Sequence, residues 1–150
     1  MQRSISHQNP LVPFIYVILF IAYESLCTIY LFLPPLFAVL FVVFVNALKR
    51  EDTIAIFLTS FCLVVYESQM GFPLFSSIIY FVLIYKFVMP KLKKNFGCVS
   101  CIKASYVLLA YFGFYLFMSL LANIFLLPMP TLNYYIIYYI VIEFFIVSIL

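Results

Sequence analysis

The sequence predicts an all-α, polytopic membrane helix bundle with about six transmembrane helices in three hairpins. Three observations predict this class. The chain of 150 residues is 68% hydrophobic and only 9% charged, whereas soluble domains average about 25% charged residues. Its mean hydropathy is +1.23. Prolines and short charged clusters divide it into apolar segments, several of which approach the roughly 20 residues that a spanning helix needs.

Six apolar segments follow one another in a single integral membrane domain that covers residues 1–150. They lie at about 11–33, 35–48, 53–67, 73–89, 104–127 and 131–150. The second and third are short for a bilayer, and two interpretations stay open. Both segments cross, with local thinning of the bilayer absorbing the mismatch, or the pair dips into the membrane without crossing. We favour crossing, and either arrangement leaves the two termini on the same side.

The distribution of charge predicts the orientation. Two loops carry the basic residues Lys49, Arg50, Lys91, Lys93 and Lys94. The other three turns contain proline and neither Lys nor Arg. With six crossings, both basic loops and both termini lie on one side, and the positive-inside rule makes that side cytoplasmic. The lysine cluster also suits anionic lipid headgroups.

Three acidic residues lie in or beside the apolar segments and need an explanation: Glu24, Glu67 and Glu143. A charged group at mid-bilayer costs roughly 2.5–3.5 kcal/mol on insertion scales, so it usually faces protein or water. For Glu24 and Glu143 we weigh a proton or cation path against a carboxyl that fixes helix register through Tyr or Ser partners, and we favour the structural role. We expect Glu67, at the mouth of a turn, to stay hydrated and to help build that turn.

No arrangement of residues points to catalysis. The chain offers no Ser/His/Asp or Cys/His set and no glycine-rich phosphate loop, so we predict a protein that is not an enzyme, with no cofactor and no nucleic-acid partner. Cys98 and Cys101 form a C-x-x-C in a basic loop. Zinc would need two more ligands, and cytosolic thiols are normally reduced, so we expect this pair to be incidental.

The turn of the second hairpin is the most distinctive stretch of the sequence. It contains Glu67, Gly71 and the step Pro73-Leu74. Gly71 can take a positive φ and end the preceding helix, and Pro73 can open the next helix at its first position. Glu67 can accept hydrogen bonds from the free backbone donors of that next helix and oppose its dipole. The spacing therefore predicts a tight turn closed by an acidic side chain.

This turn resembles the MreD family of bacterial rod-shape-determining membrane proteins, whose third helix ends in a turn of the form D-x-x-x-G-x-P-L-G. Glu67 takes the acidic place, Gly71 the glycine and Pro73-Leu74 the Pro-Leu step, while Glu replaces Asp and Phe75 replaces the final Gly. The resemblance implies a non-enzymatic scaffold of the cell-elongation machinery in the bacterial inner membrane. It would link an MreC-like protein to the peptidoglycan polymerase and transpeptidase, with this turn as a contact surface.

The alternative is a small-solute-binding membrane subunit of a transporter. The MreD family is thought to share its six-helix architecture with the substrate-binding subunits of energy-coupling-factor transporters. That function needs a polar, water-accessible pocket, for which the sequence offers few candidates besides Glu24 and Glu143. We therefore favour the scaffold, and a homo-oligomer stays open.

Overall fold

A computed structural model describes residues 11–129 and 131–150, and every regular element in these residues is a helix. The elements are α1 (Val12–Ile29), α2 (Phe37–Arg50), α3 (Thr53–Met70), α4 (Ser76–Leu83), η1 (Ile84–Val88), α5 (Met89–Asn95), α6 (Val99–Leu108), η2 (Leu109–Gly113), α7 (Phe114–Phe125) and α8 (Tyr135–Ile149). The predicted all-α class is confirmed.

Six of these elements combine into two long continuous rods, each interrupted by a π-helical turn. The segment η1 joins α4 to α5 and ends two residues before Pro90, and η2 joins α6 to α7 and ends at Gly113. Proline has no N–H to give to the preceding turn, so a local widening of the helix accommodates it. The first rod thus runs from Ser76 to Asn95 and the second from Val99 to Phe125.

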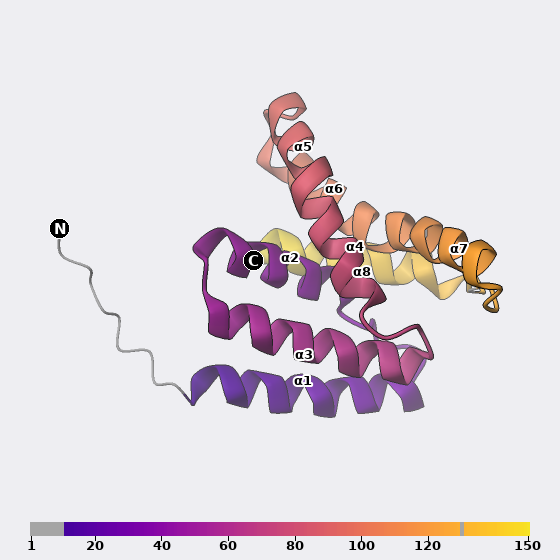
Figure 1. Cartoon of the computed structure of the whole chain (residues 1–150). Coiled ribbons are helices and arrows are strands. Elements are labelled where there is room, and N and C mark those ends of the chain that lie inside the picture. The colour runs from indigo at the N-terminus through magenta and orange to yellow at the C-terminus, as the bar shows by residue number, and fades with distance from the viewer. Residues whose placement is uncertain (1–10, 130) are drawn as a thin grey trace.

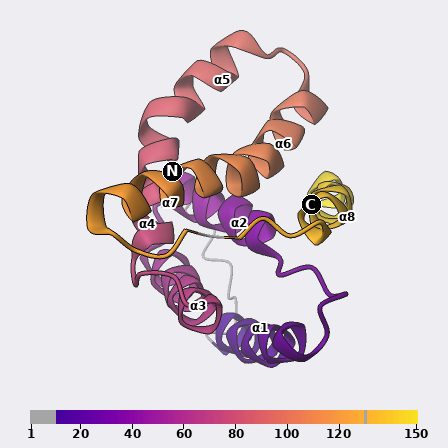
Figure 2. The same ribbon diagram turned by 90° about the vertical axis from the view of Figure 1, so that its right-hand side faces the viewer.

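The helices form two groups with different directions. In Figure 1, α1, α3, α2 and α8 run lengthwise across the view, with α1 at the lower edge. The rod α4–η1–α5 rises steeply from this group, and α6 returns beside it. Figure 2 looks along the first group, so that α1 and α8 appear nearly end-on while α5 and α6 run obliquely above them.

The core is built around α2. Seven of its 14 residues are buried, whereas α1 buries only Glu24 and Cys27. The ring of Phe37, at the start of α2, packs against aromatic rings of α3, α4 and α7, which are Tyr66, Phe81 and Phe114. Most of this short helix is therefore enclosed by its neighbours, and its exposed residues are Val43, Asn46, Lys49 and Arg50.

The exterior is apolar as well. Large hydrophobic side chains lie exposed along α1, on the outer faces of α3 and α7, and on α8. Three helices in the described ranges are long and apolar enough to cross a membrane: α1, α3 and the rod Val99–Phe125. Soluble monomers rarely expose such large apolar patches, so this exterior is that of an integral membrane protein.

The helix bounds correct the predicted segments. The first ends at Ile29 rather than 33, because the chain turns before the prolines at 34 and 35, and α2 starts at Phe37. The third is longer than predicted and reaches Met70, which makes it a full candidate span. The fourth starts later and continues through Pro90 to Asn95, and the fifth begins five residues earlier, at Val99. Both extensions were missed because lysines and Pro90 suggested a loop.

Candidate functional site

Glu67 closes the turn between α3 and α4 from the inside. One carboxylate oxygen accepts the N–H of Phe75 at 2.6 Å. The other accepts the hydroxyl of Ser76 at 3.0 Å and the N–H of Ser77. These are free donors at the start of α4, so the carboxylate caps that helix and faces the positive end of its dipole. The predicted role in building the turn is confirmed, and the expected hydration is wrong, because Glu67 is fully buried.

The rest of the turn agrees with the prediction in part. Gly71 ends α3 with φ +72°, as predicted. Pro73 does not open the next helix, since α4 begins three residues later, after Phe75 takes a left-handed conformation with φ 68°. The left-handed residue reverses the chain, and the Glu67 carboxylate caps α4 by accepting hydrogen bonds from its free backbone donors, as predicted.

Glu143 performs the same task for α2. Its two carboxylate oxygens accept the N–H groups of Phe37 at 3.1 Å and Ala38 at 2.6 Å. The hydroxyl of Tyr111, in η2, donates to the same carboxylate. Glu143 lies on α8 and is fully buried. Glu143 therefore has the tyrosine partner that we predicted, and its contacts join α8, α2 and η2, as the structural role that we favour requires.

Both capped helices begin in the same way. The tripeptide Pro-Leu-Phe lies just before or at the start of each, and the N-cap residue is left-handed: Leu36 with φ 52° and Phe75 with φ 68°. A left-handed conformation costs a residue other than glycine on the order of 1–3 kcal/mol unless its surroundings hold it. At each start a buried glutamate binds backbone N–H groups at or within two residues of the left-handed residue, so the carboxylates hold two strained turns.

Glu24 differs from both. It is fully buried on α1, and neither of its carboxyl oxygens has a hydrogen-bond partner in the described part of the chain. Its neighbours direct their donors elsewhere: Tyr23 O–H donates to the carbonyl of Pro34 at 2.8 Å, and the Cys27 thiol lies 3.7 Å from the same oxygen. The expected Tyr or Ser partner is therefore wrong for Glu24.

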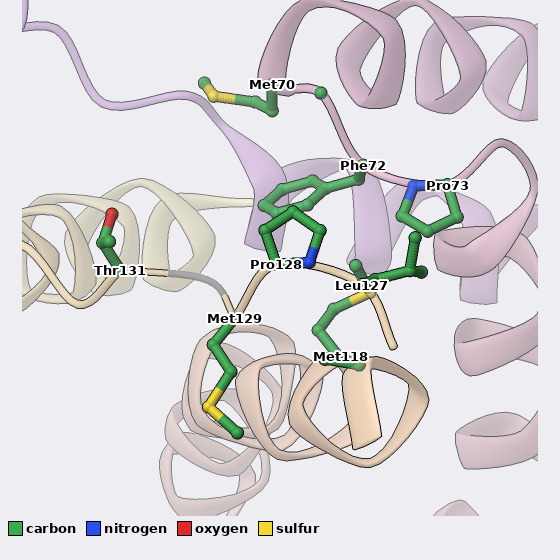
Figure 3. A pocket seen from close by; sticks show the side chains of 10 residues that line it. Met70, Phe72, Pro73, Met118, Leu127, Pro128, Met129 and Thr131 are labelled. Carbon is green, nitrogen blue, oxygen red and sulfur yellow. The ribbon is translucent and has the colours of Figure 1, made fainter. Parts of the chain in front are cut away.

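An apolar cavity of about 570 Å³ lies beside the Glu67 turn. Figure 3 shows Phe72 and Pro73 of this turn facing Pro128 and Leu127 of the turn after α7. Its wall includes three methionines, Met70, Met118 and Met129. Thr131 provides the one hydroxyl among the ten lining residues. Methionines fill and adapt to irregular apolar surfaces, so the cavity suits an apolar group.

The basic residues gather at the other end of the helices. Lys91, Lys93 and Lys94 lie on α5 rather than in a loop, and the charges of Lys49 and Lys93 lie close enough to interact. Lys49 and Arg50 form the last turn of α2, where cations complement the helix dipole. The ammonium of Lys103 donates to the carbonyl of Ser148 at 2.9 Å, which brings the start of α6 to the end of α8.

The two exposed cysteines lie at the start of α6. Cys98 is the N-cap residue and Cys101 lies in the first turn. Hydrogen bonds from the Cys101 thiol and backbone lower the pKa of the Cys98 thiol. Among the described residues no group of three His, Cys, Asp or Glu side chains could hold a metal ion.

Sequence reasoning missed two residues of this arrangement, Tyr111 and Tyr80. Tyr111 shares Glu143 with α2, and Tyr80 donates to the carbonyl of Leu109 at 2.7 Å, in the first turn of η2. With 13 tyrosines in the chain, composition gave no reason to single out either. Gly113 is the one clue to Tyr80, because a Cβ at position 113 would collide with the Tyr80 hydroxyl in the described structure.

Comparisons with protein-family models, curated proteins and solved structures find no match to this chain.

Proposed function

We propose that the chain crosses the membrane six times, with the basic end on the cytoplasmic side and the proline turns outside. Two observations support this topology. The lysines of α5 lie near Lys49, and Lys103 lies near the end of α8. At the opposite end, residues 70–73 line one cavity together with residues 127–129 and 131. The helix α2, roughly 21 Å long at 1.5 Å per residue, needs a thinned bilayer or its flanking turns to complete the crossing.

We propose further that the protein is a non-enzymatic scaffold of the cell-elongation machinery in a bacterial inner membrane, as the MreD-like turn suggests. One observation carries this proposal. Both carboxylate oxygens of Glu67 accept hydrogen bonds inside the molecule. The turn that they stabilise leaves Leu74 58% exposed, next to the apolar cavity. The partner contact predicted for the turn thus falls to Gly71, Pro73 and Leu74, and not to the Glu67 carboxylate.

The composition of the cavity favours a protein partner over a polar solute. Its lining is apolar apart from backbone groups and the hydroxyl of Thr131. A binding site for a polar solute needs several convergent polar side chains. An apolar side chain of a membrane-anchored partner, such as an MreC-like protein with a single span and a coiled coil, fits this lining better.

Site-specific photocrosslinking tests the proposed contact. A photoreactive residue at position 74 should crosslink a single-span, coiled-coil protein in living cells of the source bacterium. The matched control is position 57, because Phe57 is 72% exposed on α3 but lies away from the turn. Crosslinks from position 57 with none from position 74 would contradict the proposed contact.

A genetic experiment separates the scaffold from the transporter subunit. Depletion of the protein should round the cells, and a gene for the coiled-coil partner should lie beside its own. If Glu24→Gln and Glu143→Gln instead abolished uptake of a solute and left cell shape intact, the scaffold proposal would fall.

A further inference from the structure

The three buried glutamates differ in the number of hydrogen-bond donors around them, and this difference indicates which of the carboxyls are ionised. Glu67 and Glu143 each accept three hydrogen bonds, two of them from backbone N–H groups at a helix start. Such donors stabilise the ionised carboxylate. Glu24 accepts none, although it is buried as deeply. Burying an ionised carboxylate without donors or a counter-charge costs far more than burying the neutral acid.

The electrostatic surroundings of Glu24 add to this cost. In the described ranges, the one charge that acts on Glu24 is that of Glu143. The titratable groups whose charge interacts with that of Glu24 come from α1, α3, α8 and η2, and they are Tyr23, Cys27, Cys62, Tyr66, Tyr111 and Glu143. None of them is basic. Two like charges in one apolar site repel each other, so one carboxyl keeps its proton.

The position of Glu24 on α1 shows that its burial is specific. This helix lies at the edge of the bundle, and its only buried residues are Glu24 and Cys27. Glu24 precedes the tripeptide Pro35-Leu36-Phe37 as Glu67 precedes Pro73-Leu74-Phe75, but the cap of α2 comes from Glu143. The donors that Glu24 would need as an anion are therefore already occupied.

We propose that Glu24 is an intramembrane proton-binding site, in which a protonated carboxyl stands beside the ionised carboxylate of Glu143. The ligand of the site is a proton. Loss of that proton places a second negative charge within electrostatic reach of Glu143, whose carboxylate is already bound at the N-terminus of α2.

Labelling of the full-length protein with dicyclohexylcarbodiimide tests the charge assignment. The carbodiimide takes the acid proton on one nitrogen while a carboxyl oxygen bonds its central carbon, and the acyl group then migrates to nitrogen. The product is a stable N-acylurea from which no atom is lost. At neutral pH, peptide mass spectrometry should find at least about twice as much label on Glu24 as on Glu67 or Glu143. The label should decrease as the pH rises, and Glu24→Gln should remove it.

A sodium arm distinguishes a proton from a metal cation. Sodium chloride should protect Glu24 no better than choline chloride at the same ionic strength. Specific protection by sodium would overturn the proposal in favour of a sodium site. Label on Glu143 with none on Glu24 would overturn the assignment of the charges.

Infrared difference spectra cover the case in which the reagent does not reach Glu24. Wild-type protein minus Glu24→Gln should show the carbonyl band of a protonated carboxyl at neutral pH, shifted in D₂O. The absence of this band would show that Glu24 is ionised and would refute the proposal. Glu67→Gln serves as the matched control, because it should remove no such band.

Discussion

At the scale of single residues, Glu67 and Glu143 show why an acidic side chain is tolerated in so apolar a protein. Each carboxylate replaces the water that a helix start would otherwise bind, and each donor that it satisfies would be costly to leave unpaired in this environment. The expense of a buried charge is thus offset by two backbone N–H groups and a hydroxyl at each site. The same hydrogen bonds that cap each helix therefore also allow the carboxylate to be buried in an apolar protein.

We expect Glu143→Ala to destabilise the protein by about 2–4 kcal/mol, because it leaves two buried N–H groups of α2 without an acceptor. Tyr111→Phe removes only one of the three donors, so its effect should be about 1 kcal/mol. Both losses of stability can be measured by unfolding the tagged protein in mild detergent, with thermal aggregation as the readout. Equal stability of Glu143→Ala and wild type would show that the cap contributes nothing.

The two exposed cysteines should differ in reactivity. Because hydrogen bonding lowers the pKa of the Cys98 thiol, its thiolate is more populated near neutral pH than that of an ordinary cysteine. Iodoacetamide should therefore modify Cys98 faster than Cys101 in the wild-type protein, and Cys101→Ala should slow the modification of Cys98 because it removes the thiol that donates to it. Equal rates at the two cysteines of the wild type would contradict the prediction.

At the scale of elements, the π turns explain how the two rods pack. Widening of the helix at η2 leaves the Leu109 carbonyl available to the Tyr80 hydroxyl, and Gly113 provides the space in which that hydroxyl lies. The rod α4–η1–α5 is thereby joined to the rod α6–η2–α7 at one point inside the core. A straight α-helix would direct the carbonyl to its own next turn.

Gly113→Ala should therefore destabilise the protein by about 1–3 kcal/mol, because the added Cβ meets the Tyr80 hydroxyl and forces a shift in a filled core. Tyr80→Phe removes that oxygen, so the double variant should be more stable than Gly113→Ala alone. A thermal melt of the three variants tests this coupling. Strictly additive losses would mean that the two residues do not interact.

The elements also show what a single sequence can and cannot predict. The turn at Glu67 was predictable, because an acid, a glycine and a proline at short spacing carry local information about capping and reversal. The cap of α2 was not, because Glu143 lies 105 and 106 residues along the chain from the two N–H groups that it binds. Lys91–Lys94 suggested a loop although they continue a helix, since the composition of a helix end outside the membrane resembles that of a loop.

At the scale of the whole molecule, the two ends of the bundle differ in chemistry. One end gathers lysines from α2, α5 and α6. The other gathers proline turns around an apolar cavity. We propose that this asymmetry fixes the orientation in the membrane, because basic segments resist translocation.

Neutralising the basic end should therefore disturb the orientation. Replacing Lys49, Arg50, Lys91, Lys93 and Lys94 with Gln should give a mixed population, read by fusing a reporter that is active on only one side to the end of α8. Replacement of Lys103 alone, which donates to Ser148, is the matched control and should leave the reporter on one side. An unchanged orientation in the fivefold variant would refute the assignment.

The bond between Glu143 and the start of α2 also sets an order of events during synthesis. Ribosomes add roughly 5–20 residues per second, so α2 emerges on the order of 5–20 s before the side chain that caps it. In that interval the left-handed turn at Leu36 and the free N–H groups of Phe37 and Ala38 have no carboxylate from α8. The buried centre of the bundle is thus completed only when α8 inserts, and a nascent chain halted before residue 143 should be a substrate for membrane proteases.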